Sequence, residues 1–588
     1  MNKREKDVLN VIAKSKFENQ RMLAEECGHS LGIVNQSIKN LINAGYLSAE
    51  MQITKKAKEM IQENSPRNAI ILAAGFGMRM VPINRELPKA LLKVKGEILI
   101  ERTIRQLHEA GITKICVVVG FMKEHFEYLI DKYGVKLVVN PEYALKNNLH
   151  SLKYVLKELS NTYIVPCDLW CADNPYSDME LYSWYMVKDA FDDESTVRVG
   201  RNGDLLPVSK SKQGNTMVGI SYFTEEKSRI LKSNIEHMCK DKCFDKVFWE
   251  EALYITQPIE IAAKVVSPKV VVEINTYEQL RDFDSDSSLL KNDAISQIEA
   301  VFGVPSSEIK DITVLKKGMT NRSFLFNCKG EKYIMRIPGE GTERLINRTE
   351  EADVYEVVNE NNICDDVKYM NPKTGYKITK FIEGARVCDP YDVTDIKKCM
   401  KVLRDFHDLK LRVKHEFDIF GQIEFYESLW DKKESVYQDY RQTKDKVMAL
   451  REYIMQQPKK NVLTHIDAVP DNFLFYIDAH GKENIRLIDW EYAGMQDPHV
   501  DIAMFCIYSM YDKEHVDQLI DIYFEGQCPR QLRAKIYCYI AACGLLWSNW
   551  CEYKSQLGVE FGGYSLCQYR FAKEYYKYAV EEIGKIES

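Results

Sequence analysis

Short amphipathic stretches make up the first 65 residues of the chain. Apolar side chains recur at helical spacing in 8–12, 22–23 and 33–42. Residues 53–54 then form a brief extended run, and 55–62 return to a helical pattern. The pattern predicts three short helices, a short strand and a fourth helix.

From Asn68 onward the apolar positions gather in short continuous runs of strand length. Helical stretches at 99–110 and 123–132 separate these runs, and a polar stretch at 282–286 closes the segment near residue 290. Alternating strands and helices are typical of a parallel sheet with helices on both faces. The expected strands are Ala69–Ala73, Ile115–Val119, Leu137–Val139 and Tyr163–Val165.

After residue 290 the order of elements changes again. Antiparallel strands are predicted at 312–315, 323–327 and 332–337, and helical periods dominate from Val393 onward, except for a loop and strands at 465–490. A small sheet lobe joined to a large helical lobe is the expected shape. We therefore divide the chain into the segments 1–65, 66–290 and 291–588.

The composition narrows the class of protein. The 588 residues include 45% hydrophobic and 28% charged residues, which is ordinary globular composition and excludes a fibrous or disordered chain. The net charge of −7 is too small for a protein that coats nucleic acid or a membrane surface. No apolar run is long enough to span a bilayer, and the N-terminus lacks a secretory pattern. The 16 cysteines form no CxxC pair, so we expect reduced thiols in a cytoplasmic protein, with self-association left open.

Glycines and cations follow the first strand of the second segment. AAGFGMR at 73–79 lets backbone N–H groups approach phosphate oxygens, and PKALL at 88–92 returns a lysine to the same loop. Together these motifs resemble the nucleotidyltransferases that join a nucleoside triphosphate to a phosphorylated small molecule. The resemblance implies a Rossmann-like sheet and assigns Arg79 and Lys89 to catalysis. The residues it assigns to the nucleotide are Leu72, Ala73, Ala74, Gly75 and Gly77.

The same resemblance implies a Mg²⁺ site. Asp168 ends a predicted strand, where relatives hold the metal against the α-phosphate. Relatives usually supply a second Asp where this chain has Asn275, so either Glu273 or Asn275 completes the site. An oxygen of the acceptor phosphate would attack the α-phosphorus in line as pyrophosphate leaves, and the cations would supply electrostatics and positioning.

Further residues resemble the pocket of the CTP:phosphocholine cytidylyltransferases. Asn148 and Ser151 lie in the segment that lines the nucleotide and acceptor pocket in that family. A trimethylammonium group is attracted to the faces of aromatic rings. The rings expected to face it are Trp170 and Trp249, with Tyr182 and Trp184 as further candidates.

The third segment carries HIDAVPDN at 465–472 and IDWEYA at 488–493. This pattern resembles the choline and ethanolamine kinases and the related aminoglycoside phosphotransferases, which have a bilobal fold like that of protein kinases. The resemblance implies that Asp467 accepts the proton of the substrate hydroxyl. Asn472 and Asp489 would hold Mg²⁺ on the ATP phosphates.

Upstream residues match the nucleotide-binding lobe of the same families. LKKGMTNRS at 315–323, which includes Asn321, corresponds to the loop over the phosphates. Arg336 stands where protein kinases carry a lysine, and choline kinases also have arginine there. Glu351 on the next helix is expected to pair with Arg336, although Glu350 is a second candidate.

Aromatic residues are expected to select the alcohol substrate. Trp547 and Trp550 are one helical turn apart, and similar helices wall the ammonium pocket of choline kinases. A quaternary ammonium has no N–H donor, so rings and a carboxylate suit it. The residues expected to bind this substrate are Glu491, Tyr492, Trp547, Trp550 and Tyr564.

The two resemblances together imply a bifunctional enzyme with Mg²⁺ as its cofactor. It would phosphorylate choline with ATP and then transfer CMP from CTP to phosphocholine, as in the bacterial system that activates choline for decorating surface glycans. One alternative is a sugar-phosphate nucleotidyltransferase fused to a sugar or aminoglycoside kinase. The other is a DNA-binding regulator that uses degenerate enzyme domains as sensors.

Residues 1–65 resemble the winged helix-turn-helix family in their order of elements. Ten basic and eight acidic residues give this segment a net charge of +2, and Lys39 is the one cation of the third helix. Binding to duplex DNA depends on several contacts between basic side chains and phosphates, and this segment offers few basic side chains for them. A packing or dimerisation module is therefore favoured over DNA binding, which stays open.

Overall fold

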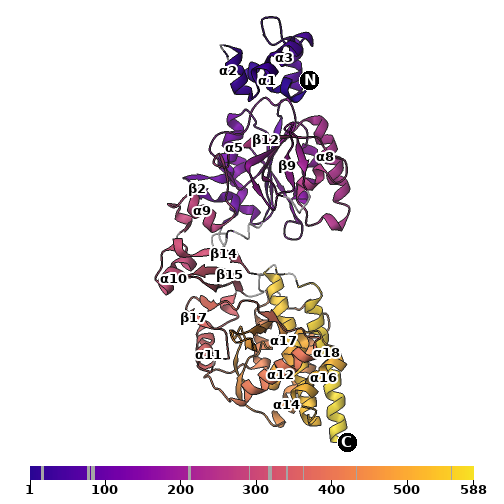
Figure 1. Cartoon of the computed structure of the whole chain (residues 1–588). Coiled ribbons are helices and arrows are strands. Elements are labelled where there is room, and N and C mark those ends of the chain that lie inside the picture. Colours follow the sequence, from indigo (N-terminus) through magenta and orange to yellow (C-terminus); the bar gives the residue numbers. More distant parts are fainter. Residues whose placement is uncertain are drawn as a thin grey trace. The chain divides into compact units, whose positions relative to one another are not determined.

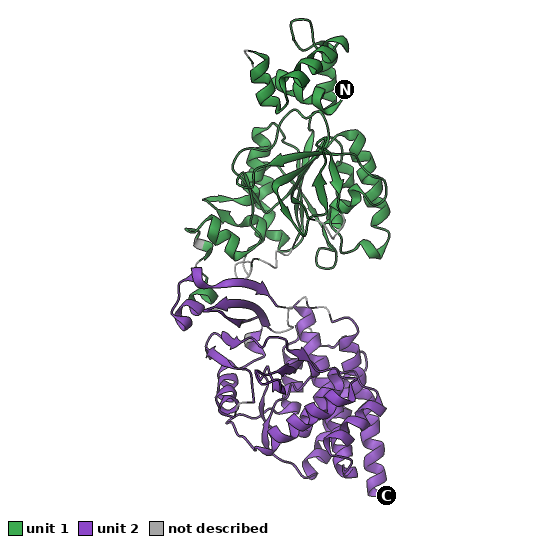
Figure 2. Cartoon of the chain, in the orientation of Figure 1, with its two compact units in different colours: residues 1–296 green, residues 297–588 purple. Residues whose placement is uncertain are grey.

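The chain forms two compact units, residues 1–296 and 297–588 (Figure 2). Their elements are labelled along the chain in Figure 1. The computed structural model describes every residue except 15, 16, 18, 76–79, 81–86, 209–212, 291, 316–320, 340, 341, 362, 432, 433, 558 and 560. Within this described part, no helix has the length and apolar character needed to cross a membrane.

The first unit begins with the helices that the sequence predicts. They are α1 (Lys3–Lys14), α2 (Gln20–Cys27), α3 (Leu31–Asn43) and α4 (Lys55–Asn64), and an isolated antiparallel bridge joins Leu47 to Ile53 between the last two. Their apolar faces share one core with Met179 and Leu181 of the following segment. Tyr182 Oη also donates a hydrogen bond of 2.6 Å to Asp7. The N-terminal helices are thus packed onto the segment that follows them.

A seven-stranded sheet in the order β12-β8-β11-β6-β1-β4-β5 forms the centre of this unit (Figure 1). The strands β5, β4, β1 and β6 run parallel, as predicted, but β11 is antiparallel to both β6 and β8. The prediction of a parallel sheet is therefore confirmed for the four predicted strands, and β11 departs from it. Antiparallel neighbours need no crossover helix, and small strands rather than a helix link β8 to β11. The strand bounds are β1 (Asn68–Ala73), β4 (Ile115–Val119), β5 (Lys136–Val139), β6 (Thr162–Pro166), β8 (Trp184–Asp192), β9 (Val197–Val199), β10 (Leu205–Pro207), β11 (Gly214–Phe223) and β12 (Ala262–Val266).

Two apolar layers, one on each face of the sheet, contain the helices. One layer includes α5 (Leu99–Glu109) and α6 (Tyr128–Tyr133), and the other includes α7 (Asn148–Lys153) and α8 (Glu225–Met238). The helix expected at 123–132 is split into a 3-10 turn at Lys123–Phe126 and α6. The short strands β2 (Lys93–Val94) and β3 (Glu97–Ile98) pair with each other, as do β7 (Leu169–Cys171) and β13 (Val271–Glu273), and α9 (Tyr277–Phe283) follows.

The second unit has a small sheet followed by a helical lobe. The sheet has five antiparallel strands in the order β14-β15-β16-β18-β17, and Gly330 makes the turn between β15 and β16 with a φ of +80°. The helix α11 (Arg348–Glu360) follows β16 in the chain. The strands are β14 (Lys310–Val314), β15 (Asn321–Cys328), β16 (Glu331–Pro338), β17 (Val367–Met370) and β18 (Lys377–Lys380), and α10 (Asp293–Phe302) lies where the two units meet in the chain.

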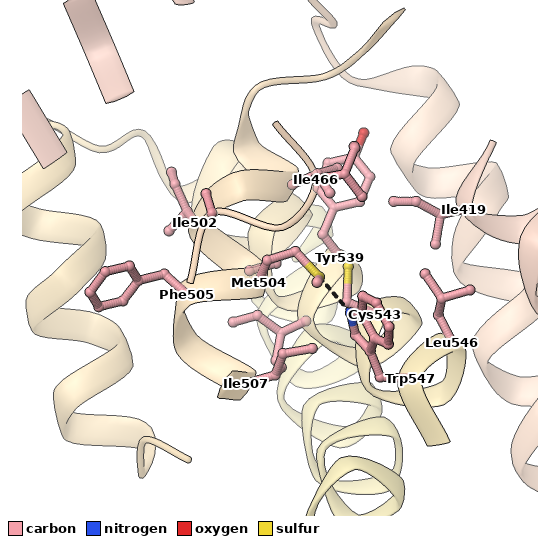
Figure 3. Close-up of a cluster of buried hydrophobic side chains, with 14 of the residues drawn as sticks. Ile419, Ile466, Ile502, Met504, Phe505, Ile507, Tyr539, Cys543, Leu546 and Trp547 are labelled. Carbon is pink, nitrogen blue, oxygen red and sulfur yellow. Dashed lines mark hydrogen bonds between the residues drawn. The ribbon is translucent and has the colours of Figure 1, made fainter. Parts of the chain in front are cut away.

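The helical lobe is built around α17 (Arg530–Gln556), whose residues from Ala534 to Lys554 are buried. Figure 3 shows side chains of α17 packed against Ile502, Met504 and Phe505, where Trp547 Nε1 donates to Met504 Sδ over 3.1 Å. The other helices are α12 (Val393–Asp408), α13 (Ile419–Ser428), α14 (Tyr440–Gln456), α15 (His499–Tyr508), α16 (Lys513–Tyr523) and α18 (Tyr564–Glu587). The strands β19 (Arg386–Val387), β20 (Val462–Thr464), β21 (Phe473–Ile477), β22 (Glu483–Leu487) and β23 (Gly494–Gln496) complete the lobe.

A buried ion pair ties α17 to the loop before α15. Lys535 Nζ lies 2.7 Å from Asp497 Oδ2, and both side chains are fully buried. Lys535→Met should lower the free energy of unfolding of this lobe by about 3–5 kcal/mol, because Asp497 would keep a buried charge without its partner. Urea denaturation followed by tryptophan fluorescence measures this loss.

Lys573→Met is the matched control for this prediction. Lys573 pairs with Asp439 at the surface, with both side chains more than two-fifths exposed. Its loss should cost about 0.5 kcal/mol, since exposed ion pairs contribute little. Equal destabilisation by the two variants would contradict the importance of the buried pair.

Candidate active sites

The first site gathers three residues from distant parts of the first unit. Lys89 lies in a 3-10 turn (Lys89–Leu91), Asp168 follows β6, and Asn275 follows β13. Lys89 Nζ donates to Asp168 Oδ2 over 2.6 Å and also to Asn275 Oδ1. The side chains of Lys89 and Asp168 are only 10% and 20% exposed. The structure therefore brings together the lysine and two of the three metal-ligand candidates.

Oxygen atoms at this site fit a divalent cation. Asp168 Oδ1 is buried and accepts no hydrogen bond from the described residues. Burial and then the neighbouring Asp168 carboxylate raise the pKa of Glu273, as expected for two carboxylates that lie close together. Carboxylate and amide oxygens are ligands that Mg²⁺ prefers. No cluster of three or more His, Cys, Asp or Glu side chains with metal-binding geometry occurs among the described residues.

The glycine-rich loop starts at the end of β1. Leu72 and Ala73 end the strand, and Ala74 and Gly75 follow it, whereas Gly77 and Arg79 lie outside the described residues. Gly120, which sequence reasoning missed, supports this loop. A Cβ on Gly120 would lie 2.7 Å from Ala74 O, so only glycine lets the two backbone segments approach this closely.

Asn148 and Ser151, both on α7, use their side chains within the protein. Asn148 Oδ1 accepts a hydrogen bond of 2.8 Å from the backbone N–H of Trp249. Ser151 Oγ accepts one of 3.1 Å from Asn140 Nδ2 and is buried. These contacts tie both residues to neighbouring segments of the first unit, and their contact with a nucleotide stays a prediction.

The rings expected to face an ammonium group have other neighbours. Trp170 stacks on the Arg102 guanidinium, 4.4 Å from the ring centre, and Lys95 Nζ is 5.1 Å from it. Trp170 therefore already has two cationic neighbours within the protein, and its contact with an ammonium group stays a prediction. Trp249 is 1% exposed and packs in the core, 6.0 Å from the ring of Tyr185. It can support a pocket wall but cannot present its face to a ligand.

The second site surrounds a cavity of about 180 Å³ in the second unit. Eight of the residues predicted from the sequence line it, and they come from the loops 467–472 and 489–492 and the helices α17 and α18. Those residues are Asp467, Asn472, Asp489, Glu491, Tyr492, Trp547, Trp550 and Tyr564. Sequence reasoning missed Val469, Asp471, Met504, Ile507 and Tyr508, which complete the lining.

The catalytic loop is held in a strained conformation. Ile466 has a φ of +68°, a region that L-residues avoid. Asp501 on α15 fixes this turn by accepting hydrogen bonds of 3.1 Å from the His465 N–H and 2.7 Å from the Ile466 N–H. The turn presents the neighbouring Asp467 to the cavity.

Asp467 lies among other carboxylates. Burial raises its pKa to about 8, and the Asp489 and Glu491 carboxylates add to this rise. Asn472 Nδ2 donates to Asp467 O over 2.9 Å and to Asp467 Oδ2 over 3.2 Å. The surplus of buried negative charge fits a divalent cation at Asn472 and Asp489. Such a cation, when bound, would neutralise charge on the nucleotide phosphates.

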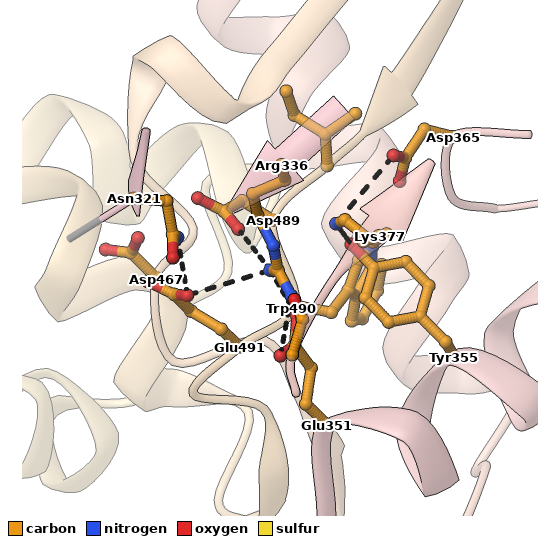
Figure 4. Close-up of polar contacts among 12 residues, drawn as sticks. Asn321, Arg336, Glu351, Tyr355, Asp365, Lys377, Asp467, Asp489, Trp490 and Glu491 are labelled. Carbon is orange, nitrogen blue, oxygen red and sulfur yellow. Dashed lines mark hydrogen bonds and ion pairs between the residues drawn. The ribbon is translucent and has the colours of Figure 1, made fainter. Parts of the chain in front are cut away.

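A network of alternating charges lies beside the catalytic loop (Figure 4). Arg336 on β16 forms a two-pronged ion pair with Glu351 on α11, and the second of these hydrogen bonds is 2.9 Å long. Arg348, which the sequence analysis did not single out, donates to Glu351 over 2.8 Å and to Glu491 over 3.2 Å. Asn321 Nδ2 also donates to Glu491, over 2.8 Å. The predicted partner of Arg336 is thus Glu351, and Glu491 links the cavity to this network.

Aromatic rings also line the cavity. The rings of Tyr492 and Trp547 meet edge to face with centroids 5.4 Å apart, and those of Trp547 and Trp550 with centroids 5.3 Å apart. The ring centroids of Tyr564 and Tyr508, which also line the cavity, are 6.3 Å apart. A cavity lined by both aromatic rings and carboxylates suits a small organic cation that carries a hydroxyl group.

Trp547→Leu should raise the KM for such a cation about tenfold and change kcat much less. A cation over a desolvated aromatic ring gains up to about 2 kcal/mol of binding free energy, and leucine cannot supply this interaction. Steady-state kinetics with choline measure this split. Trp430→Leu is the control, since Trp430 is equally buried in the same lobe and packs on Tyr440 away from the cavity. An unchanged KM in the Trp547 variant, or an equal rise in the control, would contradict the assignment.

Comparisons with known proteins agree with these two sites. Residues 69–178 match the family model of the MobA-like NTP transferase domain, and residues 312–565 match that of choline/ethanolamine kinase. The choline-phosphate cytidylyltransferase of Streptococcus pneumoniae is 31% identical over 229 residues, covering 38% of this chain and 99% of that protein. The 2-aminoethylphosphonate cytidylyltransferase of Lancefieldella rimae is 32% identical over 236 residues, covering 37% of this chain and 92% of that protein. Protein LicA of Haemophilus influenzae is 28% identical over 263 residues, covering 42% of this chain and 95% of that protein.

The folds and sites therefore define a nucleotidyltransferase joined to a phosphotransferase of the kinase type. Through its first unit the chain belongs to the choline-phosphate cytidylyltransferase family, and its second unit is a choline kinase-like domain.

Proposed function

We propose that the chain makes CDP-choline in two steps. The kinase domain phosphorylates choline with ATP, and the nucleotidyltransferase domain then transfers CMP from CTP to phosphocholine and releases pyrophosphate. The observation that carries the proposal is the cavity that Asp467, Asp489, Trp547 and Trp550 line together. Its occupant must offer both a hydroxyl group and an organic cation, and choline has both.

The residues of each site have distinct tasks in this proposal. Asp467 removes the proton of the choline hydroxyl, Arg336 and Glu351 orient the nucleotide phosphates, and Asn472 and Asp489 hold Mg²⁺. In the other domain, Lys89 neutralises phosphate charge, and Asp168 with Asn275 and Glu273 holds Mg²⁺ near the α-phosphate. The resemblance to nucleotidyltransferases also assigns Arg79 and Gly77 to the nucleotide site. The domains would span 66–290 and 291–588.

Two separate incubations of the full-length chain test this function. Choline with ATP and Mg²⁺ should give phosphocholine and ADP, and phosphocholine with CTP and Mg²⁺ should give CDP-choline and pyrophosphate. Glucose 1-phosphate and an aminoglycoside test the alternative pairing of a sugar nucleotidyltransferase with a sugar kinase. Faster turnover of those substrates would replace the proposal. Ethanolamine and 2-aminoethylphosphonate, tested beside choline and phosphocholine, decide between a quaternary and a primary amine.

The N-terminal helices serve, in this proposal, as a packing module of winged-helix type. Their core includes Met179 and Leu181, and Lys3 Nζ donates to Gly203 O over 3.1 Å, so part of their basic surface is used within the chain. Fluorescence anisotropy with labelled duplex DNA tests the regulator alternative. Salt-sensitive, sequence-specific binding together with absent turnover would favour a sensor.

A further inference from the structure

Four carboxylates line the cavity of the second unit, namely Asp467, Asp471, Asp489 and Glu491. In the proposed function, Asp467 accepts the proton of the alcohol and Asp489 holds Mg²⁺. Glu491 already has a cation of the protein beside it, since Arg348 Nη1 donates to its Oε2 over 3.2 Å. Asp471 is therefore the lining carboxylate to which neither a reaction step nor a cation has been assigned.

Tyr508 on α15 fixes the side chain of Asp471. The Tyr508 hydroxyl donates a hydrogen bond of 2.8 Å to Asp471 Oδ2, and both residues line the cavity. Among the described residues, no Lys, Arg or His forms an ion pair with Asp471. Because Asp471 lines the cavity and is also exposed, its carboxylate is accessible to a ligand that enters.

Two of the rings that line the same cavity are also accessible. Tyr508 and Tyr564 are half-buried, and their rings meet edge to face with centroids 6.3 Å apart. Trp547 and Trp550 are more deeply buried, with 7% and 1% of their surface exposed. The exposed carboxylate of Asp471 thus shares the cavity with two rings that keep part of their surface free, which is the combination of groups that suits an organic cation.

We propose that Asp471 supplies the countercharge for the organic cation of the alcohol substrate and that Tyr508 positions its carboxylate. A quaternary ammonium has no N–H donor, so it is attracted to a carboxylate by charge and does not compete for the hydrogen bond from Tyr508. Asp471 would act together with the aromatic rings of the cavity and would determine the preference for a cationic over a neutral alcohol. This inference rests on the proposed kinase function.

Asp471→Asn in the full-length chain tests this assignment. The KM for choline should rise about fivefold, the effect of losing one ion pair that is open to solvent. The KM for ATP and the formation of CDP-choline from supplied phosphocholine should not change. The amide has nearly the same size and can still accept the hydrogen bond from Tyr508, so the loop should keep its conformation. An unchanged KM for ATP separates the role of Asp471 from that of its neighbour Asn472, the metal-ligand candidate.

Two further variants test the same contact. Tyr508→Phe keeps the ring and removes the hydroxyl that holds Asp471, so it should raise the KM for choline by a smaller factor than Asp471→Asn and leave the KM for ATP unchanged. Asp478→Asn is the matched control, because it removes an aspartate from the turn between β21 and β22, outside the residues that line the cavity. It should leave both KM values unchanged.

A neutral competitor separates charge recognition from general damage to the cavity. The alcohol 3,3-dimethylbutanol has the shape of choline but carries carbon in place of the cationic nitrogen. Its inhibition constant against choline should be the same for wild type and Asp471→Asn, whereas the KM for choline rises. An unchanged KM for choline in Asp471→Asn, or an equal rise of both constants, would overturn the assignment. Absence of choline phosphorylation by the wild-type chain would instead overturn the proposed kinase function.

Discussion

Asp467→Asn is expected to lower the rate of choline phosphorylation by about 10²–10⁴-fold, because the amide cannot accept the proton of the choline hydroxyl. The asparagine has nearly the same size and removes a buried carboxylate that lies beside Asp489 and Glu491, so the fold should not suffer. A coupled assay of ADP formation from ATP and choline measures this loss of rate.

The same variant has an internal control in the other unit. With phosphocholine and CTP supplied, Asp467→Asn should form CDP-choline at the wild-type rate. Asp478→Asn, in the turn between β21 and β22, is the matched surface control and should keep both activities. Undiminished phosphorylation by Asp467→Asn would show that another group accepts the proton.

Lys89→Ala is expected to give the opposite phenotype, with phosphocholine accumulating from choline and ATP. Lys89 is the described cation that contacts both Asp168 and Asn275, so its loss removes charge neutralisation where phosphate charge develops. The loss of one such preorganised donor typically costs about 10²–10³-fold in rate. Pyrophosphate release from CTP and phosphocholine measures it.

Lys93→Ala supplies the control for this second prediction. Lys93 is an exposed lysine of β2, a few residues after Lys89, and its removal should not change pyrophosphate release. If Lys89→Ala kept the wild-type rate, the contact of Lys89 with the reacting phosphates would be refuted. If Lys93→Ala lost the rate as well, the effect would be one of general surface charge.

The sequence was most informative where chemistry is concentrated in short motifs. The segments 465–472 and 488–493 and the two tryptophans of α17 converge on one cavity, as predicted from their spacing and their resemblance to kinases. Lys89 and Asp168 likewise meet although they are far apart in the chain. In each of these places, the residue lies at the end of a predicted strand or in a loop, and this position limited where its side chain could lie.

Contacts that depend on tertiary packing escaped the sequence. The antiparallel β11 was missed because its apolar run does not reveal the direction of its neighbours. Trp170 looked like a free aromatic ring, but Arg102 from α5 covers it. Arg348 stood in no motif, and only its partners in the folded chain point to its role.

One time course tests the central claim most directly, namely that one site makes the substrate of the other. Wild-type chain is mixed with choline, ATP, CTP and Mg²⁺ and followed by phosphorus NMR. Phosphocholine and ADP should appear first, and CDP-choline and pyrophosphate should follow as phosphocholine is consumed. ADP formation without phosphocholine, or phosphocholine that persists unconverted beside unused CTP, would contradict the account.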